Sequence, residues 1–108
     1  MPEQMKTAAK SRVRTVELTV RIDCRDASAT WLRFLQIVGE LSVVVLGSAR
    51  HDFPGGGLTG VIILAESHAA IHTWPEDGTA WVELATCGDP ADLTRFIGLM
   101  SEWEQSAD

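Results

Sequence analysis

The 108-residue chain is short of positive charge and of long apolar runs, and each shortage excludes a class of partner. Nine Lys and Arg stand against fifteen Asp and Glu, so the formal net charge is −6. Nucleic-acid phosphates require basic patches, so we expect no nucleic-acid partner. No apolar run approaches the roughly 18 residues of a membrane-spanning helix, so we expect no membrane partner.

The chain is also short of cysteine and has no apolar stretch behind its first methionine. Residues 1–10 are polar, so we expect no signal peptide. Cys24 and Cys87 could form at most one disulfide, and without an export signal we expect both to be free thiols. These features together predict a cytoplasmic protein.

Length and composition predict one globular domain. A chain of 108 residues can bury one core but not two. Hydrophobic residues make up 45% and charged residues 22%, which argues against disorder. We expect a mobile leader over residues 1–13, which are polar and aperiodic, and a single domain over 14–108.

Hydrophobic patterning predicts four strands. Apolar and polar residues alternate over 16–22, which is typical of a half-buried strand. We expect a second strand over 41–46, continuing towards Phe53, a third over 61–65 and a fourth over 81–87.

Capping signals predict two helices. Asp26 is expected to cap a helix that ends near Gly39, and Asp89-Pro90 is a typical helix start. The closing helix is expected to present one apolar face, consisting of Leu93, Phe96, Ile97 and Met100.

The order β-α-β-β-β-α has short connections in its second half. The glycine-rich run 54–60 breaks regular structure, and Pro75 with Asp77-Gly78 predicts a turn region over 69–78. Short links favour antiparallel pairing, so we expect an α+β two-layer sandwich: a mainly antiparallel four-stranded sheet with two helices on one face. The uncovered sheet face would require a partner, which predicts a homodimer.

Residues that carry chemistry concentrate between 51 and 88. All three histidines lie there, together with acidic, serine, tryptophan and cysteine side chains: His51, His68, His72, Glu66, Ser67, Trp74, Glu76 and Cys87. Histidines near turns are usually exposed to solvent or hydrogen-bonded to nearby groups. The four-residue spacing of His68 and His72 suits a zinc site on a helix, but in the irregular chain predicted here it guarantees nothing, so we expect no metal. Ser67 lacks the strand-elbow-helix setting of a hydrolase nucleophile.

The segment 58–76 reads LTGVIILAESHAAIHTWPE and closely resembles the processing region of the small prokaryotic S-adenosylmethionine decarboxylases. Its Glu-Ser-His, followed by Ile-His-Thr-Trp-Pro-Glu, is a long and specific motif. The resemblance continues at His51-Asp52-Phe53 and at Thr86-Cys87-Gly88. It is close over 51–88, whereas the rest of the chain matches only in its order of elements.

The resemblance implies a precursor that cuts itself between Glu66 and Ser67. Ser67 would become a pyruvoyl group, the cofactor that forms a Schiff base with the substrate amine. His72 is implied as the proton acceptor during processing and Cys87 as the proton donor to the product. Thr59 stands where the family usually has Ser, whose hydroxyl assists processing.

The same resemblance implies the substrate and its contacts. Phe53 and Trp74 match positions that would sandwich adenine, and Glu76 matches an acid that would hold the ribose hydroxyls. The expected reaction converts S-adenosylmethionine to CO2 and an aminopropyl donor for spermidine. Two alternatives stay open: a pyruvoyl decarboxylase of arginine or ornithine, and a homologue that does not process itself and only binds a ligand or partner.

Overall fold

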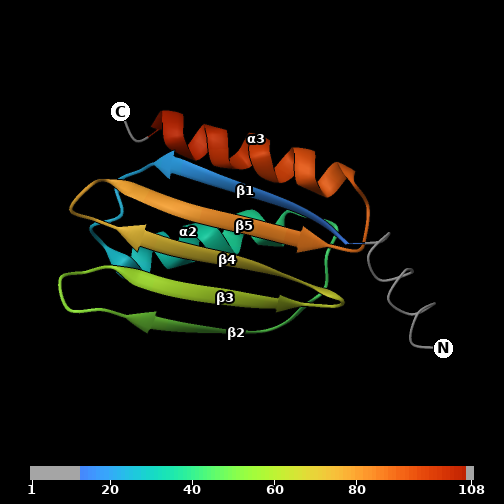
Figure 1. The fold of residues 1–108 in the computed structure, drawn as a ribbon, viewed down its shortest axis with the longest axis horizontal. Coiled ribbons are helices and arrows are strands. Elements are labelled where there is room, and N and C mark those ends of the chain that lie inside the picture. The colour runs from blue at the N-terminus through green and yellow to red at the C-terminus, as the bar shows by residue number, and fades with distance from the viewer. Residues whose placement is uncertain (1–12, 107–108) are drawn as a thin grey trace.

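The computed structural model describes residues 13–106, so the leader expected over 1–13 lies outside the described residues except for Val13. Five antiparallel strands form one sheet in the order β1-β5-β4-β3-β2. They are β1 (Arg14–Arg21), β2 (Val45–Asp52), β3 (Leu58–Leu64), β4 (Ser67–Trp74) and β5 (Thr79–Thr86). The helices α2 (Ala27–Gly39) and α3 (Ala91–Ser106) lie on one face of the sheet (Figure 1). The predicted α+β sandwich is confirmed, with five strands instead of four.

The additional strand is β4, at the centre of the sheet, and the prediction of a turn region over 69–78 is wrong for most of its length. Ala69, Ile71 and Thr73 are buried, with less buried residues between them. Alanine has a weak intrinsic preference for strands. Pairing with β3 on one side and β5 on the other stabilises this segment as a strand. Residue preferences along the local sequence do not reveal this pairing. The turn signals belong only to the link between β4 and β5.

The neighbouring strands also begin at different residues from those expected. β2 starts at Val45, and β3 starts at Leu58, inside the run that was predicted to be irregular. The loop between them is tight, because Phe53 N–H donates to the Gly57 carbonyl at 2.7 Å. Gly55 and Gly56 have φ of +98° and +101°, values that only glycine adopts readily.

Both helices begin where the sequence predicts. The Asp26 side chain accepts from Ala29 N–H at 3.0 Å, and Asp89 Oδ1 accepts from Ala91 N–H at 2.9 Å. The rings of Phe34 and Phe96 meet edge to face, with centroids 6.3 Å apart, and join α2 to α3 within the core.

One residue of the expected α3 face is placed differently. Ile97 is 41% exposed, whereas Phe96, Met100 and Trp103 are buried. The prediction that Ile97 faces the core is therefore wrong, because the buried stripe of α3 is narrower than expected.

Residues on the helix-facing side of the sheet form the core, and the close packing of α2 depends on Gly60. A Cβ at Gly60 would clash with the Trp31 ring, so the indole sits directly on the glycine. The other side of the sheet, the open face, is not covered by a helix in the described residues (Figure 1). It presents partly exposed apolar side chains, including Val61 and Ile63.

Candidate active site

The sheet has two ends, and different connections between the strands lie at each of them. The β2–β3 loop and the β4–β5 turn lie together at one end, on the left in Figure 1, which we call the pocket end. The two-residue turn between β3 and β4 and the residues that follow β5 lie at the opposite end, which we call the turn end. The expected site residues are distributed over both ends.

Five of the eight expected site residues line one pocket of about 510 Å3 at the pocket end. They come from β3, β4 and the connections that flank them: Phe53, Thr59, His72, Trp74 and Glu76. The structure therefore brings these five side chains together around one pocket.

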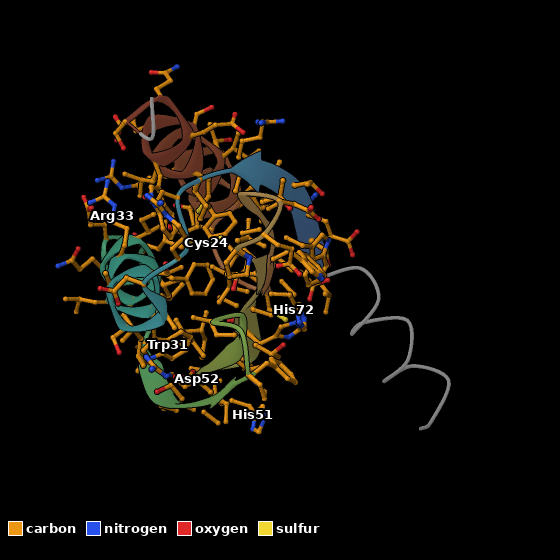
Figure 2. The ribbon with its side chains drawn as sticks, turned by 90° about the vertical axis from the view of Figure 1, so that its left-hand side faces the viewer. Cys24, Trp31, Arg33, His51, Asp52 and His72 are labelled. Atoms are coloured by element: carbon orange, nitrogen blue, oxygen red, sulfur yellow. The ribbon has the colours of Figure 1, made fainter. Side chains whose placement is uncertain are left out.

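Thr59 and His72 form the polar centre of this pocket. They are directly opposite each other across β3 and β4, and Thr59 Oγ1 lies 2.9 Å from His72 Nδ1. The His72 ring packs 5.2 Å from Trp81 and 6.5 Å from Trp74, measured between centroids. Figure 2 shows His72 on the side of the sheet away from the helices. Packing and a hydrogen bond therefore hold this imidazole in one orientation.

Aromatic and acidic groups surround that centre and remain accessible. Phe53 is 49% exposed and Trp74 44% exposed, so both rings offer free faces to a planar ligand. Glu76 is exposed in the turn after Trp74. The pocket can therefore take a flat ring and present a carboxylate to hydroxyl groups.

Two further residues, which were not among the expected site residues, support this pocket. Trp81 is the cross-strand neighbour of His72 and packs on its ring. The His51 ring meets Phe53 edge to face at 4.7 Å. Strand pairing was the signal that could have found Trp81, but it required β4 to be recognised as a strand.

The turn end holds the scissile pair implied by the resemblance. Glu66 has a φ of +60°, and among the described residues it is the one non-glycine with a positive φ. Such a conformation costs about 1–2 kcal/mol for a residue with a side chain. Ser67 follows it, and Ser67 Oγ donates to the Ala65 carbonyl at 3.3 Å. The strained turn and the serine hydroxyl are thus adjacent.

Cys87 also lies at the turn end. His68 pairs with Ala85, so the residue before His68 and the residues after Ala85 extend past the same edge of the sheet. The order of pairing therefore places Ser67 and Cys87 together. Both cysteines are free, as the sequence predicts. Cys24 donates to the Thr79 carbonyl at the pocket end, and burial raises the pKa of its thiol.

The two groups of site residues are far apart within one chain. Ser67 and His72 are five residues apart on an extended strand, which corresponds to about 16 Å at the usual rise of about 3.3 Å per residue. The expected nucleophile and its expected proton acceptor therefore do not meet inside a single chain.

His68 and His72 are likewise separated. Four residues of strand correspond to about 13 Å, too far for one metal ion to bind both side chains. Within residues 13–106, no cluster of three or more His, Cys, Asp or Glu side chains could hold a metal ion. His68 Nε2 instead lies 2.8 Å from Glu83 Oε1 on β5.

Comparison with known proteins gives one consistent family. The family model described as S-adenosylmethionine decarboxylase matches residues 23–103. The S-adenosylmethionine decarboxylase proenzyme of Pseudomonas aeruginosa is 38% identical over 89 residues, which cover 81% of this chain and 56% of that protein. The proenzyme of Aquifex aeolicus is 52% identical over 52 residues, 48% of this chain and 38% of that protein.

A solved structure shares the fold. The crystal structure of the adenosylmethionine decarboxylase from Aquifex aeolicus superposes with a TM-score of 0.74 at 27% identity, covering 86% of this chain and 79% of that chain. The chain spans little more than half the length of the Pseudomonas relative. Among residues 13–106, no helix is both long and apolar enough to cross a membrane.

Proposed function

Because the chain belongs to the S-adenosylmethionine decarboxylase family, we propose that it is a proenzyme that cleaves itself and then decarboxylates S-adenosylmethionine. The cut falls between Glu66 and Ser67 and yields a β chain of residues 1–66 and an α chain of 67–108. One observation at the turn end carries this proposal: Ser67, with its hydroxyl, directly follows Glu66, which is held at a φ of +60°.

The self-cleavage needs only groups that the chain supplies. Ser67 Oγ attacks the Glu66 carbonyl carbon, the C–N bond breaks as the C–O bond forms, and the hydroxyl proton passes to the released amine nitrogen. Removal of the Ser67 α-proton then breaks the Cβ–O bond and releases the Glu66 carboxylate. The remaining dehydroalanine takes up water and loses ammonia, which leaves the pyruvoyl group. Relief of the strain at Glu66 favours the first step.

His72 is the proposed acceptor of the α-proton, and Thr59 holds its ring through the 2.9 Å contact. Because about 16 Å of strand separates Ser67 from His72 in one chain, the acceptor must come from a second copy. The open face provides the surface for that copy, since its apolar side chains Val61 and Ile63 are 37% and 52% exposed.

A homodimer with one particular symmetry completes the site. Sheets that pack face to face lie about 10 Å apart. A two-fold axis that runs between the sheets and crosses the strands places the pocket end of one protomer over the turn end of the other. The end of β4 that carries Ser67 then lies over His72 of the partner subunit, and two identical sites form.

Ser67 fits the pyruvoyl group, because its side chain stands free at the end of β4 with only the Ala65 carbonyl as a hydrogen-bond partner among the described residues. The chemistry that this group would supply is an electron sink for the loss of CO2. Cys87, at the same end of the sheet, returns a proton to the product carbon.

Phe53 and Trp74 stack on the adenine, and Glu76 binds the ribose hydroxyls. The product is an aminopropyl donor for spermidine, and the cytoplasmic location stays a prediction from the sequence.

Mass spectrometry of the purified protein tests the cleavage. We expect two chains, the larger ending at Glu66 and the smaller blocked to Edman degradation by its terminal ketone. S67A keeps one chain, because no oxygen remains to form the ester. A single stable mass for the unsubstituted chain after long incubation would refute the proposal.

A mixed dimer tests which protomer supplies the proton acceptor. S67A and H72A each lack one partner, so each is expected to remain largely uncut as a homodimer. When the two are co-expressed, the Ser67 end of the H72A chain lies over the intact His72 of the S67A chain, and we expect the H72A chain to be cut. Failure of the mixture to cleave, with mixed dimers present, would contradict the two-fold arrangement.

A further inference from the structure

Asp92 is a buried carboxylate that the proposed chemistry does not use. It lies in the first turn of α3, where a negative charge is favoured by the helix dipole, and it is 3% exposed. Asp92 Oδ1 accepts from Ser42 N–H at 2.9 Å, whereas Oδ2 has no hydrogen-bond partner among the described residues. Burying an incompletely paired carboxylate costs folding free energy, so an apolar side chain at this position would stabilise the core more.

The segment that Asp92 holds leads to the scissile turn. Two residues after Ser42, the Val44 carbonyl accepts from Ala65 N–H at 3.0 Å. Ala65 is the residue before Glu66, so this bond fixes the turn on its N-terminal side. A short path of hydrogen bonds and backbone thus joins the Asp92 carboxylate to the peptide that is cut.

Arg95 adds a second attachment of the same segment to α3. Its Nε donates to the Glu40 carbonyl at 3.3 Å, and its Nη2 lies 3.2 Å from Glu40 Oε1. The Arg95 and Glu40 side chains are about half exposed, so this ion pair contributes little by itself. Asp92 provides the buried attachment, and the start of α3 is thereby a fixed support for residues 40–44.

We propose that Asp92 is a positioning residue for self-cleavage: by holding Ser42 it keeps the Val44 carbonyl in place, and through it the strained turn at Glu66. This role rests on the proposed function. A φ of +60° at Glu66 persists only where the surroundings hold it, and the Val44–Ala65 hydrogen bond is part of those surroundings. With the bond loosened, the turn can relax and Ser67 Oγ loses its approach to the Glu66 carbonyl.

Precursor cleavage in Asp92 variants tests the role. D92A removes the acceptor for Ser42 N–H, and we expect cleavage to slow about tenfold, the scale of a lost hydrogen bond to a charged group. D92N keeps an oxygen that can accept from Ser42 and should restore most of the rate. T30V is the matched control: it breaks the buried 2.8 Å hydrogen bond from Thr30 Oγ1 to the Asp26 carbonyl, remote from the turn end, and should not change cleavage.

Amide hydrogen exchange in the uncleavable S67A background separates positioning from general stability. We expect D92A to accelerate exchange at Ala65 and Ser42 while core amides of β5 keep their protection. D92L, which fills the site without polar atoms, should slow cleavage as D92A does at a Tm close to the parent, and it replaces D92A if that variant does not fold.

Normal cleavage in both D92A and D92L, or unchanged exchange at Ala65, would overturn the role of Asp92. An unsubstituted chain that never cleaves would instead refute the proposed function, and the role in cleavage with it, even where the exchange data still show the attachment.

Discussion

Thr59 Oγ1 and His72 Nδ1 lie 2.9 Å apart across β3 and β4, so a single contact joins the proposed processing hydroxyl to the proposed proton acceptor. The two residues are thirteen positions apart in the chain. Their contact depends on strand register, because a shift of one residue would move one of the side chains to the opposite face of the sheet.

The Thr59 methyl group leads to a prediction about processing rate. T59S keeps the hydroxyl, removes the methyl and frees χ1, so we expect precursor cleavage at least as fast as in the parent. T59V keeps the shape but loses the contact with His72, and cleavage should slow about tenfold. Cleavage rates are followed by gel densitometry from freshly translated precursor. A much slower T59S would show that the surroundings have adapted to threonine.

Trp74 is expected to serve substrate binding and not processing. A stacked base is worth roughly 1–3 kcal/mol, so W74A should lower kcat/KM for S-adenosylmethionine about tenfold to a hundredfold while precursor cleavage continues. The measurement is release of labelled CO2, compared among S-adenosylmethionine, arginine and ornithine. L32A, which truncates an exposed side chain on α2 away from the pocket, is the control. Release from arginine or ornithine alone would contradict the choice of substrate.

The two cysteines should differ in reactivity. Cys24 is 1% exposed and burial raises the pKa of its thiol above the ordinary value of 9.0, whereas Cys87 is partly exposed. Iodoacetamide at mildly alkaline pH should therefore modify Cys87 and leave Cys24 intact until the protein unfolds. Peptide mapping by mass spectrometry identifies the labelled residue. Equal labelling of both in the folded protein would contradict the burial of Cys24.

The raised pKa of Cys24 also sets a direction for stability against pH. The folded state prefers the neutral thiol, so the contribution of Cys24 is complete below its ordinary pKa and is lost as the pH rises through the higher pKa of the folded state. Urea denaturation should show stability falling more steeply above pH 9 in the parent than in C24A. Parallel pH profiles for the two proteins would count against this effect.

Gly60 and Gly98 should respond oppositely to alanine. G60A places a Cβ where it clashes with the Trp31 ring and should cost about 1–3 kcal/mol of unfolding free energy. G98A has open space around its Cβ within α3 and should stabilise by about 0.5–1 kcal/mol. Urea denaturation of both variants gives the comparison, and a stable G60A would mean that α2 can move away from the sheet.

Local signals in the sequence were sufficient for both helices and for the family. Asp26 and Asp89 are caps because a side-chain oxygen just before a helix satisfies a free N–H, which requires no knowledge of the rest of the fold. The Glu-Ser-His motif and the Ile-His-Thr-Trp-Pro-Glu that follows it indicate the family by their residue types and order alone. The family found by comparison agrees with that interpretation.

Only the tertiary structure decided where those residues stand. β4 is a strand because β3 and β5 pair with it on both sides. Ala69 and Ala70 have a weak preference for strands, so the local sequence does not predict this strand. Once β4 is extended, Ser67 and His72 lie at opposite ends of the sheet, although they are near neighbours in the chain. Sequence determined which groups are present, and strand extension decided that one protomer cannot bring them together.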